Sequence, residues 1–202
     1  IYEDVILFLN NAESTMEDYR NFLFMGPSGV GKTTWARLIG RIYKAVGMFL
    51  YGTVAETNQS SYISGYTGQT GIKTVSTLNA NLENIILIDE AYSITESGSY
   101  GSDVITALVD WMDKNIGCYM IIAAGYEDRI LRHFIGDNEG LDRRFNNKYL
   151  FEYYTGEAMV GILTRNLQKA DLLDQRESAT GVHLAPLSGP SRADSNTGDA
   201  TE

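Results

Sequence analysis

The sequence predicts an α/β fold, a three-layer αβα sandwich in which a parallel sheet lies between two layers of helices. Residues 85–88 (IILI) and 118–124 (CYMIIAA) are apolar runs, which is typical of strands covered on both faces. Such runs alternate along the chain with segments whose apolar residues recur at helical spacing. Alternating strands and helices form right-handed crossovers, which place the strands parallel to one another in one sheet.

The elements are expected in the following order. A short helix at 1–9 and a polar, acidic linker at 10–20 precede the core, which covers 21–154. Strands are predicted at 21–25, 50–55, 85–88, 118–124 and 148–153. Helices are predicted at 33–46, 71–82, 103–114, 127–135 and 157–169. Residues 174–202 are rich in Ser, Thr, Gly and Asp and show no apolar period, so a disordered tail is expected there.

Composition excludes several classes of protein. Of the 202 residues 44% are hydrophobic, enough for a core, yet no apolar run approaches the ~20 residues that span a bilayer. The single cysteine, Cys118, excludes an internal disulfide, so we expect a soluble, intracellular protein of the cytoplasm or an organelle matrix. The formal net charge of -10 argues against a protein that coats nucleic acid or an anionic membrane. A chain that begins at Ile1 says nothing about a targeting segment.

A glycine-rich loop between the first strand and the first long helix is the most specific motif. Its sequence, GPSGVGKT at 26–33, fits the pattern G-x-x-x-x-G-K-[ST] of a phosphate-binding loop. Glycines let successive N–H groups turn towards phosphates, and the N-terminus of the next helix adds partial positive charge. Lys32 is expected to reach the β- and γ-phosphate oxygens, and Thr33 to place its hydroxyl on Mg²⁺. The predicted nucleotide-binding residues are Gly26, Pro27, Ser28, Gly29, Val30, Gly31, Lys32, Thr33, Thr34 and Asp89.

An acidic pair after the third strand completes the predicted site. Asp89 and Glu90 directly follow the run 85–88, and the carboxyl ends of parallel strands line the crevice in which α/β proteins bind ligands. Asp89 is therefore expected to orient the water shell of Mg²⁺. Glu90 is placed to polarise the water that attacks the γ-phosphate of ATP. The residues predicted to act in catalysis are thus Lys32 and Glu90.

Five segments resemble, in the correct order, the AAA+ ATPases, which are P-loop NTPases. The segments are GPSGVGKTTWARLIGRIYKAVG, SGYTGQTGIKT, IILIDEAYS, IIAAGYEDRI and NEGLDRRF, and the resemblance covers about 21–163. Within the family they are similar to the CbbX/SpoVK group, which includes the red-type Rubisco activases. The resemblance implies a chaperone-like machine that consists of identical subunits in a hexameric ring, hydrolyses ATP with Mg²⁺ and remodels a protein partner. It does not imply that Rubisco is that partner.

The resemblance also implies roles outside the phosphate loop. In the family an arginine of the neighbouring subunit completes each site; Arg144 falls on that position, and Arg143 stands beside it where a small residue is usual. Tyr126 follows the strand 118–124 at the position of a polar sensor, where it either donates its hydroxyl to the site or caps the sheet. The loop expected to line the central pore and grip an extended polypeptide consists of Tyr66, Thr67 and Gly68.

A helical lid normally follows the core in this family. Four lid helices need on the order of 50 to 60 residues, whereas only 155–173 reads as helical here, so we expect an incomplete lid. Two alternatives to the ATPase therefore stay open. One is a module that binds ATP as a switch with little turnover, and the other is a DNA-directed AAA+ ATPase, which the acidic balance disfavours.

Overall fold

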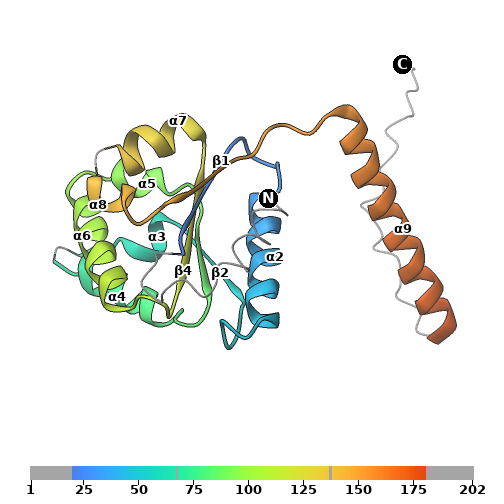
Figure 1. Ribbon diagram of the computed structural model, residues 1–202, viewed down its shortest axis with the longest axis horizontal. Coiled ribbons are helices and arrows are strands. Elements are labelled where there is room, and N and C mark those ends of the chain that lie inside the picture. The colour runs from blue at the N-terminus through green and yellow to red at the C-terminus, as the bar shows by residue number, and fades with distance from the viewer. Residues whose placement is uncertain (1–19, 67, 137, 181–202) are drawn as a thin grey trace, which may run out of the picture. The chain divides into compact units, whose positions relative to one another are not determined.

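The computed structural model describes residues 20–66, 68–136 and 138–180 (Figure 1). The predicted helix at 1–9, the predicted linker except for Arg20, and residues 181–202 of the predicted tail lie outside this part of the chain. The chain divides between Tyr153 and Tyr154 into two compact units. In the described residues the first unit contains the sheet with its helices, and the second contains α9 (Gly156–Thr180).

A parallel sheet of five strands confirms the predicted α/β class. Its strands are β1 (Phe22–Met25), β2 (Val54–Thr57), β3 (Ile85–Ile88), β4 (Met120–Gly125) and β5 (Asn147–Leu150), and their order across the sheet is β2-β3-β4-β1-β5. Because all the pairings are parallel, the carboxyl ends of the strands lie at one edge. The loop after β1 and the turn after β3 therefore open at the same edge of the sheet.

Side chains of the strands alternate between two hydrophobic clusters, one on each face of the sheet. In β3, Ile86 and Ile88 belong to one cluster, whereas Ile85 and Leu87 belong to the other. None of these four side chains is more than 1% exposed. The run IILI contains no polar residue because both faces of this strand are covered.

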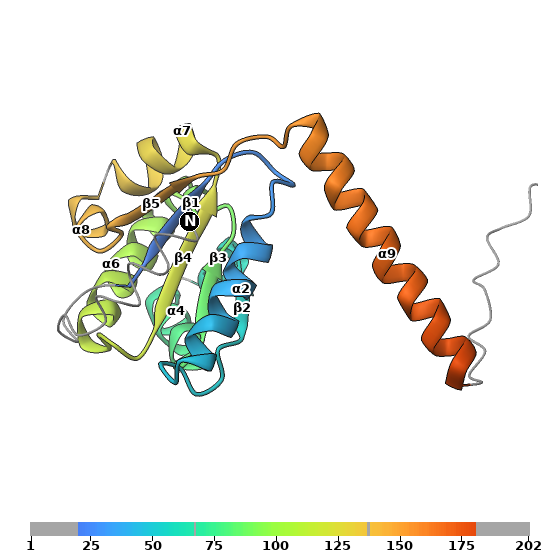
Figure 2. The ribbon, with the colours of Figure 1, turned by 45° about the vertical axis from the view of Figure 1, so that its right-hand side comes forward.

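Helices cover both faces, as predicted. α2 (Lys32–Ala45) packs on one face through Ala36, Ile39 and Tyr43. α4 (Thr70–Asn79) and α6 (Ser99–Lys114) cover the other face, and Figures 1 and 2 show them on the side of the sheet opposite α2. The remaining elements of this unit are α3 (Gln59–Tyr62), α5 (Tyr92–Thr95), α7 (Glu127–Arg129), the π-helix η1 (Ile130–Ile135) and α8 (Glu139–Asp142).

The second strand begins later than the sequence predicts, at Val54 rather than at residue 50. The cause is a close contact between Gly52 and α2. Gly52 has a φ of 60°, and a Cβ placed on it would lie 2.5 Å from the carbonyl oxygen of Gly40. The chain turns where the two backbones touch, so it enters the sheet only after that turn.

The last helix is longer than predicted, because α9 continues to Thr180. The prediction of a disordered tail is therefore wrong for 174–180. The segment DLLDQRESAT at 171–180 contains neither Gly nor Pro, and Leu, Gln, Arg, Glu and Ala favour helix; the first breaker is Gly181. No helix in the described ranges, α9 included, combines the length and the apolar character needed to cross a membrane.

Asn21, directly before β1, connects β4 to the segment between α8 and β5. Its side chain is fully buried; Oδ1 accepts a hydrogen bond from the Ile121 N–H at 2.8 Å, and Nδ2 donates to the Arg144 carbonyl at 3.0 Å.

We expect Asn21→Ala to lower the free energy of unfolding by about 2–4 kcal/mol, because two buried polar groups lose their partner. Urea denaturation measures the loss. The control Asn146→Ala, at an exposed position, should stay within about 0.5 kcal/mol of wild type.

Candidate active site

The glycine-rich loop is closed at its base and open at its tip. At the base, Gly26 has a φ of 144°, and a Cβ there would lie 2.2 Å from the carbonyl oxygen of Phe151. At the tip, Gly29 has a φ of 81°, and a Cβ there would meet no atom within 4 Å. Gly31, with a φ of 94°, is the N-cap of α2. The glycines thus fit tight packing at the base and a left-handed backbone where the loop opens.

Lys32 begins α2 and turns back over the loop. Its Nζ donates to the carbonyl oxygens of Gly26 and Pro27, both at 2.8 Å. Burial lowers the pKa of the Lys32 ammonium, while the carboxylates of Glu90 and Asp89 oppose that shift. The Lys32 ammonium therefore interacts with the carboxylates that follow β3.

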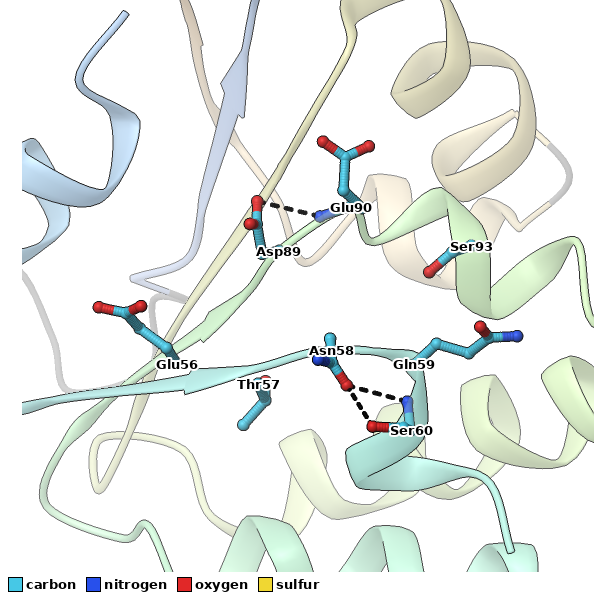
Figure 3. Close-up of a pocket in the computed structure, with 8 residues that line it drawn as sticks. All are labelled: Glu56, Thr57, Asn58, Gln59, Ser60, Asp89, Glu90 and Ser93. Atoms are coloured by element: carbon cyan, nitrogen blue, oxygen red, sulfur yellow. Dashed lines mark hydrogen bonds between the residues drawn. The ribbon is translucent and has the colours of Figure 1, made fainter. Parts of the chain in front are cut away.

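The acidic pair lies on a tight turn after β3. The Asp89 N–H donates to the Thr57 carbonyl at 2.9 Å, which continues the pairing with β2. Glu90 has a φ of 50°, the left-handed region that non-glycine residues seldom adopt, and its N–H donates to Asp89 Oδ1 at 3.1 Å (Figure 3). The Ala91 N–H then donates to the Ala124 carbonyl at 3.0 Å. Neighbouring strands on both sides thus hold the main chain of the turn.

The Glu90 carboxyl is partly buried, and its pKa is raised. Its Oε2 atom is buried and accepts no hydrogen bond from the described part of the chain. Burial, and then the charge of Asp89, raise the pKa of Glu90, whereas Lys32 and Arg129 lower it. A carboxylate with a raised pKa is a better proton acceptor than an ordinary surface glutamate, which suits a general base.

One cavity brings the predicted residues together. It has a volume of about 280 Å³ and is lined by Ser28, Gly29, Gly31, Lys32, Thr33, Thr34, Asp89 and Glu90. The other residues of the predicted loop have structural positions: Gly26 packs on Phe151, Pro27 presents its carbonyl to Lys32, and Val30 lies in the core cluster beneath α2. The loop and the acidic pair therefore form one site.

A second cavity adjoins the first and was not predicted. It has a volume of about 470 Å³, shares Asp89 and Glu90 with the first, and is also lined by Glu56, Thr57, Asn58, Gln59, Ser60 and Ser93 (Figure 3). Asn58 follows β2 and caps α3, because its Oδ1 accepts from the Ser60 N–H at 3.0 Å and Ser61 completes a capping box. The spacing of Asn58 and Ser61, which is typical of a capping box, is the sequence signal that could have predicted the start of α3.

The residues of the first cavity suit a nucleoside triphosphate with Mg²⁺. The open tip at Gly29 leaves room for phosphates beside the main-chain N–H groups. The Thr33 hydroxyl and the Asp89 carboxylate are oxygen donors, which Mg²⁺ prefers. Within the described ranges no group of three His, Cys, Asp or Glu residues could hold a metal ion by itself. Phosphate oxygens and water would therefore supply the other ligands of Mg²⁺.

The two candidate arginines differ sharply in their surroundings. The Arg144 guanidinium donates to the Asp113 carboxylate through Nε at 2.9 Å and through Nη2, and to the Gly140 carbonyl at 2.6 Å. Its side chain is only 15% exposed, whereas that of Arg143 is 77% exposed and lies 3.8 Å from Glu139. Neither residue lines the cavity of its own chain.

This contrast predicts different effects on stability. Arg144→Ala should lower the free energy of unfolding by about 2 kcal/mol, because a forked, charge-assisted pair with Asp113 is lost. Arg143→Ala should change it by less than about 0.5 kcal/mol, because exposed pairs contribute little. Urea denaturation of both variants measures the difference. Equal stability of the two variants would contradict the role of the Arg144–Asp113 pair.

The described residues of the predicted pore loop are exposed, and so is the predicted sensor. Tyr66 is 72% exposed, and its N–H donates to Ser64 Oγ at 3.2 Å. Gly68 has a φ of 75°, and Thr67 lies outside the described residues. Tyr126 directly follows β4 as the N-cap of α7 and is 44% exposed. The roles of these residues stay predictions.

A parallel sheet whose first strand leads into a phosphate-binding loop, with a lysine and an acidic pair around one cavity, defines a P-loop nucleotide-binding protein. The chain belongs to the ATPase family associated with various cellular activities (AAA), because the model of that family matches residues 22–151. This match confirms the family-level resemblance seen in the sequence.

Three secretion-system proteins are among its relatives. The ESX-3 secretion system protein EccA3 of Mycolicibacterium smegmatis is 31% identical over 178 residues, which cover 84% of this chain and 29% of EccA3. The ESX-1 secretion system protein EccA1 of Mycobacterium tuberculosis is 30% identical over 148 residues, 71% of this chain and 26% of EccA1. The ESX-2 secretion system protein EccA2 of Mycobacterium bovis is 33% identical over 148 residues, 70% of this chain and 24% of EccA2. The chain thus spans less than a third of each relative.

Solved structures share the fold at low sequence identity. The FIGL-1 AAA domain in complex with ADP matches with a TM-score of 0.54 and 18% identity, over 75% of this chain and 49% of that chain. The Aeropyrum pernix ORC1 protein in complex with DNA matches with a TM-score of 0.58 and 17% identity, over 83% and 48% of the two chains. At such identities the likeness concerns the fold alone.

Proposed function

We propose that this chain is the ATP-hydrolysing core of an AAA machine that assembles as a homo-hexameric ring and remodels a protein partner. The observation that carries the proposal is the cavity of about 280 Å³ in which Lys32 and Thr33 meet Asp89 and Glu90. Membership of the AAA family supports ATP as the nucleotide. The raised pKa of the Glu90 carboxyl supports hydrolysis in addition to binding.

Each residue has a distinct part in the proposed reaction. The N–H groups of the loop and the Lys32 ammonium hold the phosphates and balance their charge. Thr33 would hold Mg²⁺ and Asp89 would orient its water shell, and the bound ion would supply positive charge that stabilises the phosphate oxygens. Glu90 orients the attacking water and accepts its proton. Lys32 and Thr33 come from the start of α2, and the acidic pair from the turn after β3, so the fold itself brings donor and acceptor groups together.

Two further features support a ring that acts on a protein. Arg144, with Arg143 as the alternative, would reach the site of the neighbouring subunit and stabilise charge on the γ-phosphate. The loop of Tyr66, Thr67 and Gly68 would grip an extended polypeptide. Three relatives are named as secretion-system proteins, which supports a protein as the partner. The sequence segments keep the CbbX/SpoVK group as the proposed subgroup.

A steady-state ATPase assay of the full chain, with Mg²⁺ and with EDTA, tests the proposal. We expect turnover that requires Mg²⁺, and light scattering should show a larger assembly with ATP than without. Bound ATP without turnover would contradict the enzyme and support the nucleotide switch instead. Stimulation by DNA that falls steeply with salt would support the DNA-directed alternative.

A further inference from the structure

Arg129, at the end of α7, is fixed to α5 by two contacts. Its Nη2 donates to both carboxylate oxygens of Glu96, at 2.6 and 2.7 Å. Its guanidinium carbon also lies 4.0 Å from the centre of the Tyr92 ring. Tyr92 and Glu96 are four residues apart on one helical turn, so a single guanidinium reaches both. The contacts join α7, which follows β4, to α5, which begins two residues after Glu90.

The turn that carries Glu90 lies within this group of contacts. Tyr92 is 4% exposed, and a Cβ on Gly125 would lie 2.8 Å from its ring, so the ring is packed on the end of β4. The Ser93 N–H donates to the Glu90 carbonyl at 2.8 Å, which connects the turn to α5. The φ of 50° at Glu90 is a conformation that persists only where the surroundings hold it. Movement of α5 would therefore move Glu90.

Charge lowers the pKa of Glu90 from two sides, through Lys32 and Arg129, but no hydrogen bond from the described residues fixes the Oε2 atom of its carboxylate. This atom is buried, so the main chain beneath it sets where the carboxylate points. We propose that Arg129 is a positioning residue for Glu90: by clamping Tyr92 and Glu96 it fixes the turn from which the carboxylate enters the cavity. The inference rests on the proposed ATPase function. It assigns Arg129 no contact with substrate.

The clamp can be separated from the stability of the fold. The side chains of Arg129 and Glu96 are 47% and 36% exposed, and exposed pairs contribute little to folding. We therefore expect Arg129→Ala to lower Tm by no more than about 3 °C. A large loss of Tm would show that Arg129 acts on the whole fold.

Kinetics of the full chain test the effect on the site. Arg129→Ala should lower kcat about tenfold, because a displaced base loses its alignment, and should change KM for ATP less than about twofold, because Lys32 is untouched. Arg129→Lys should recover only part of kcat, since an ammonium does not form the planar fork that meets both oxygens of Glu96. The control Arg132→Ala, exposed on η1, should match wild type.

Hydrogen exchange of the nucleotide-free protein separates this inference from the proposed function. Arg129→Ala should exchange faster at 90–96, while 32–45 keeps its protection. If the wild-type chain does not turn over ATP, the proposed function fails, and faster exchange at 90–96 still supports the clamp. Exchange equal to wild type overturns the inference. Faster exchange with unchanged kcat in an active enzyme also overturns it.

Discussion

Glu90→Gln should reduce the turnover of ATP at least about 100-fold while leaving the affinity for ATP within about threefold of wild type. The amide keeps the shape of the side chain, and the N–H of residue 90 can still donate to Asp89 Oδ1. It has lost the ability to accept a proton from water at neutral pH. Burial and the charge of Asp89 raise the pKa of the Glu90 carboxyl, so its carboxylate is a better base than that of an ordinary surface glutamate.

Two measurements separate this effect from misfolding. Binding of a fluorescent ATP analogue should be retained by Glu90→Gln, and its assembly with ATP should be at least as stable as that of wild type because the nucleotide is not consumed. The matched control is Glu127→Gln, an exposed carboxylate on α7, which should turn over ATP normally. A Glu90→Gln variant that hydrolyses ATP at the wild-type rate would remove Glu90 from the mechanism.

The parts of the site that could be predicted are those encoded in contiguous residues. The segment 26–33 needs its glycines at fixed spacing because the loop turns within itself, so the pattern is visible in the sequence alone. The acids Asp89 and Glu90 were found because they end an apolar run, and a parallel sheet brings the ends of β1 and β3 to one edge. Both segments lie within residues 22–151, which the model of the AAA family matches.

The parts that could not be predicted depend on contacts between distant segments. Arg144 pairs with Asp113, 31 positions away, so the difference between its surroundings and those of Arg143 could not be predicted from the sequence. The late start of β2 follows from the contact of Gly52 with Gly40, which appears only once α2 is packed on the sheet. The second cavity likewise forms where α3 and the turn after β3 come together. Patterns of contiguous residues thus predict where a site lies. Contacts between distant segments determine the surroundings of each side chain, and these the sequence does not predict.

Lys32→Ala should weaken the binding of ATP about 100-fold, equivalent to about 3 kcal/mol, because the variant loses the cation that holds the phosphates. Lys32→Arg should not restore binding. The Lys32 Nζ donates to the Gly26 and Pro27 carbonyls at 2.8 Å each, and the larger, planar guanidinium of arginine presents its donors in a different geometry. Isothermal titration with ATP and Mg²⁺ measures the affinities.

The control for this prediction lies on the same helix. Lys44 is exposed in the last turn of α2. Lys44→Ala removes a positive charge without touching the loop, so the affinity of this variant for ATP should equal that of wild type.

Thermal stability provides a second check. Burial already lowers the pKa of Lys32, which means that the fold penalises this charge, so its removal should leave Tm of the nucleotide-free protein within about 3 °C. Weak binding at an unchanged Tm would place the loss at the phosphates, whereas weak binding with a collapsed Tm would mean that Lys32 mainly holds the loop together through Gly26 and Pro27.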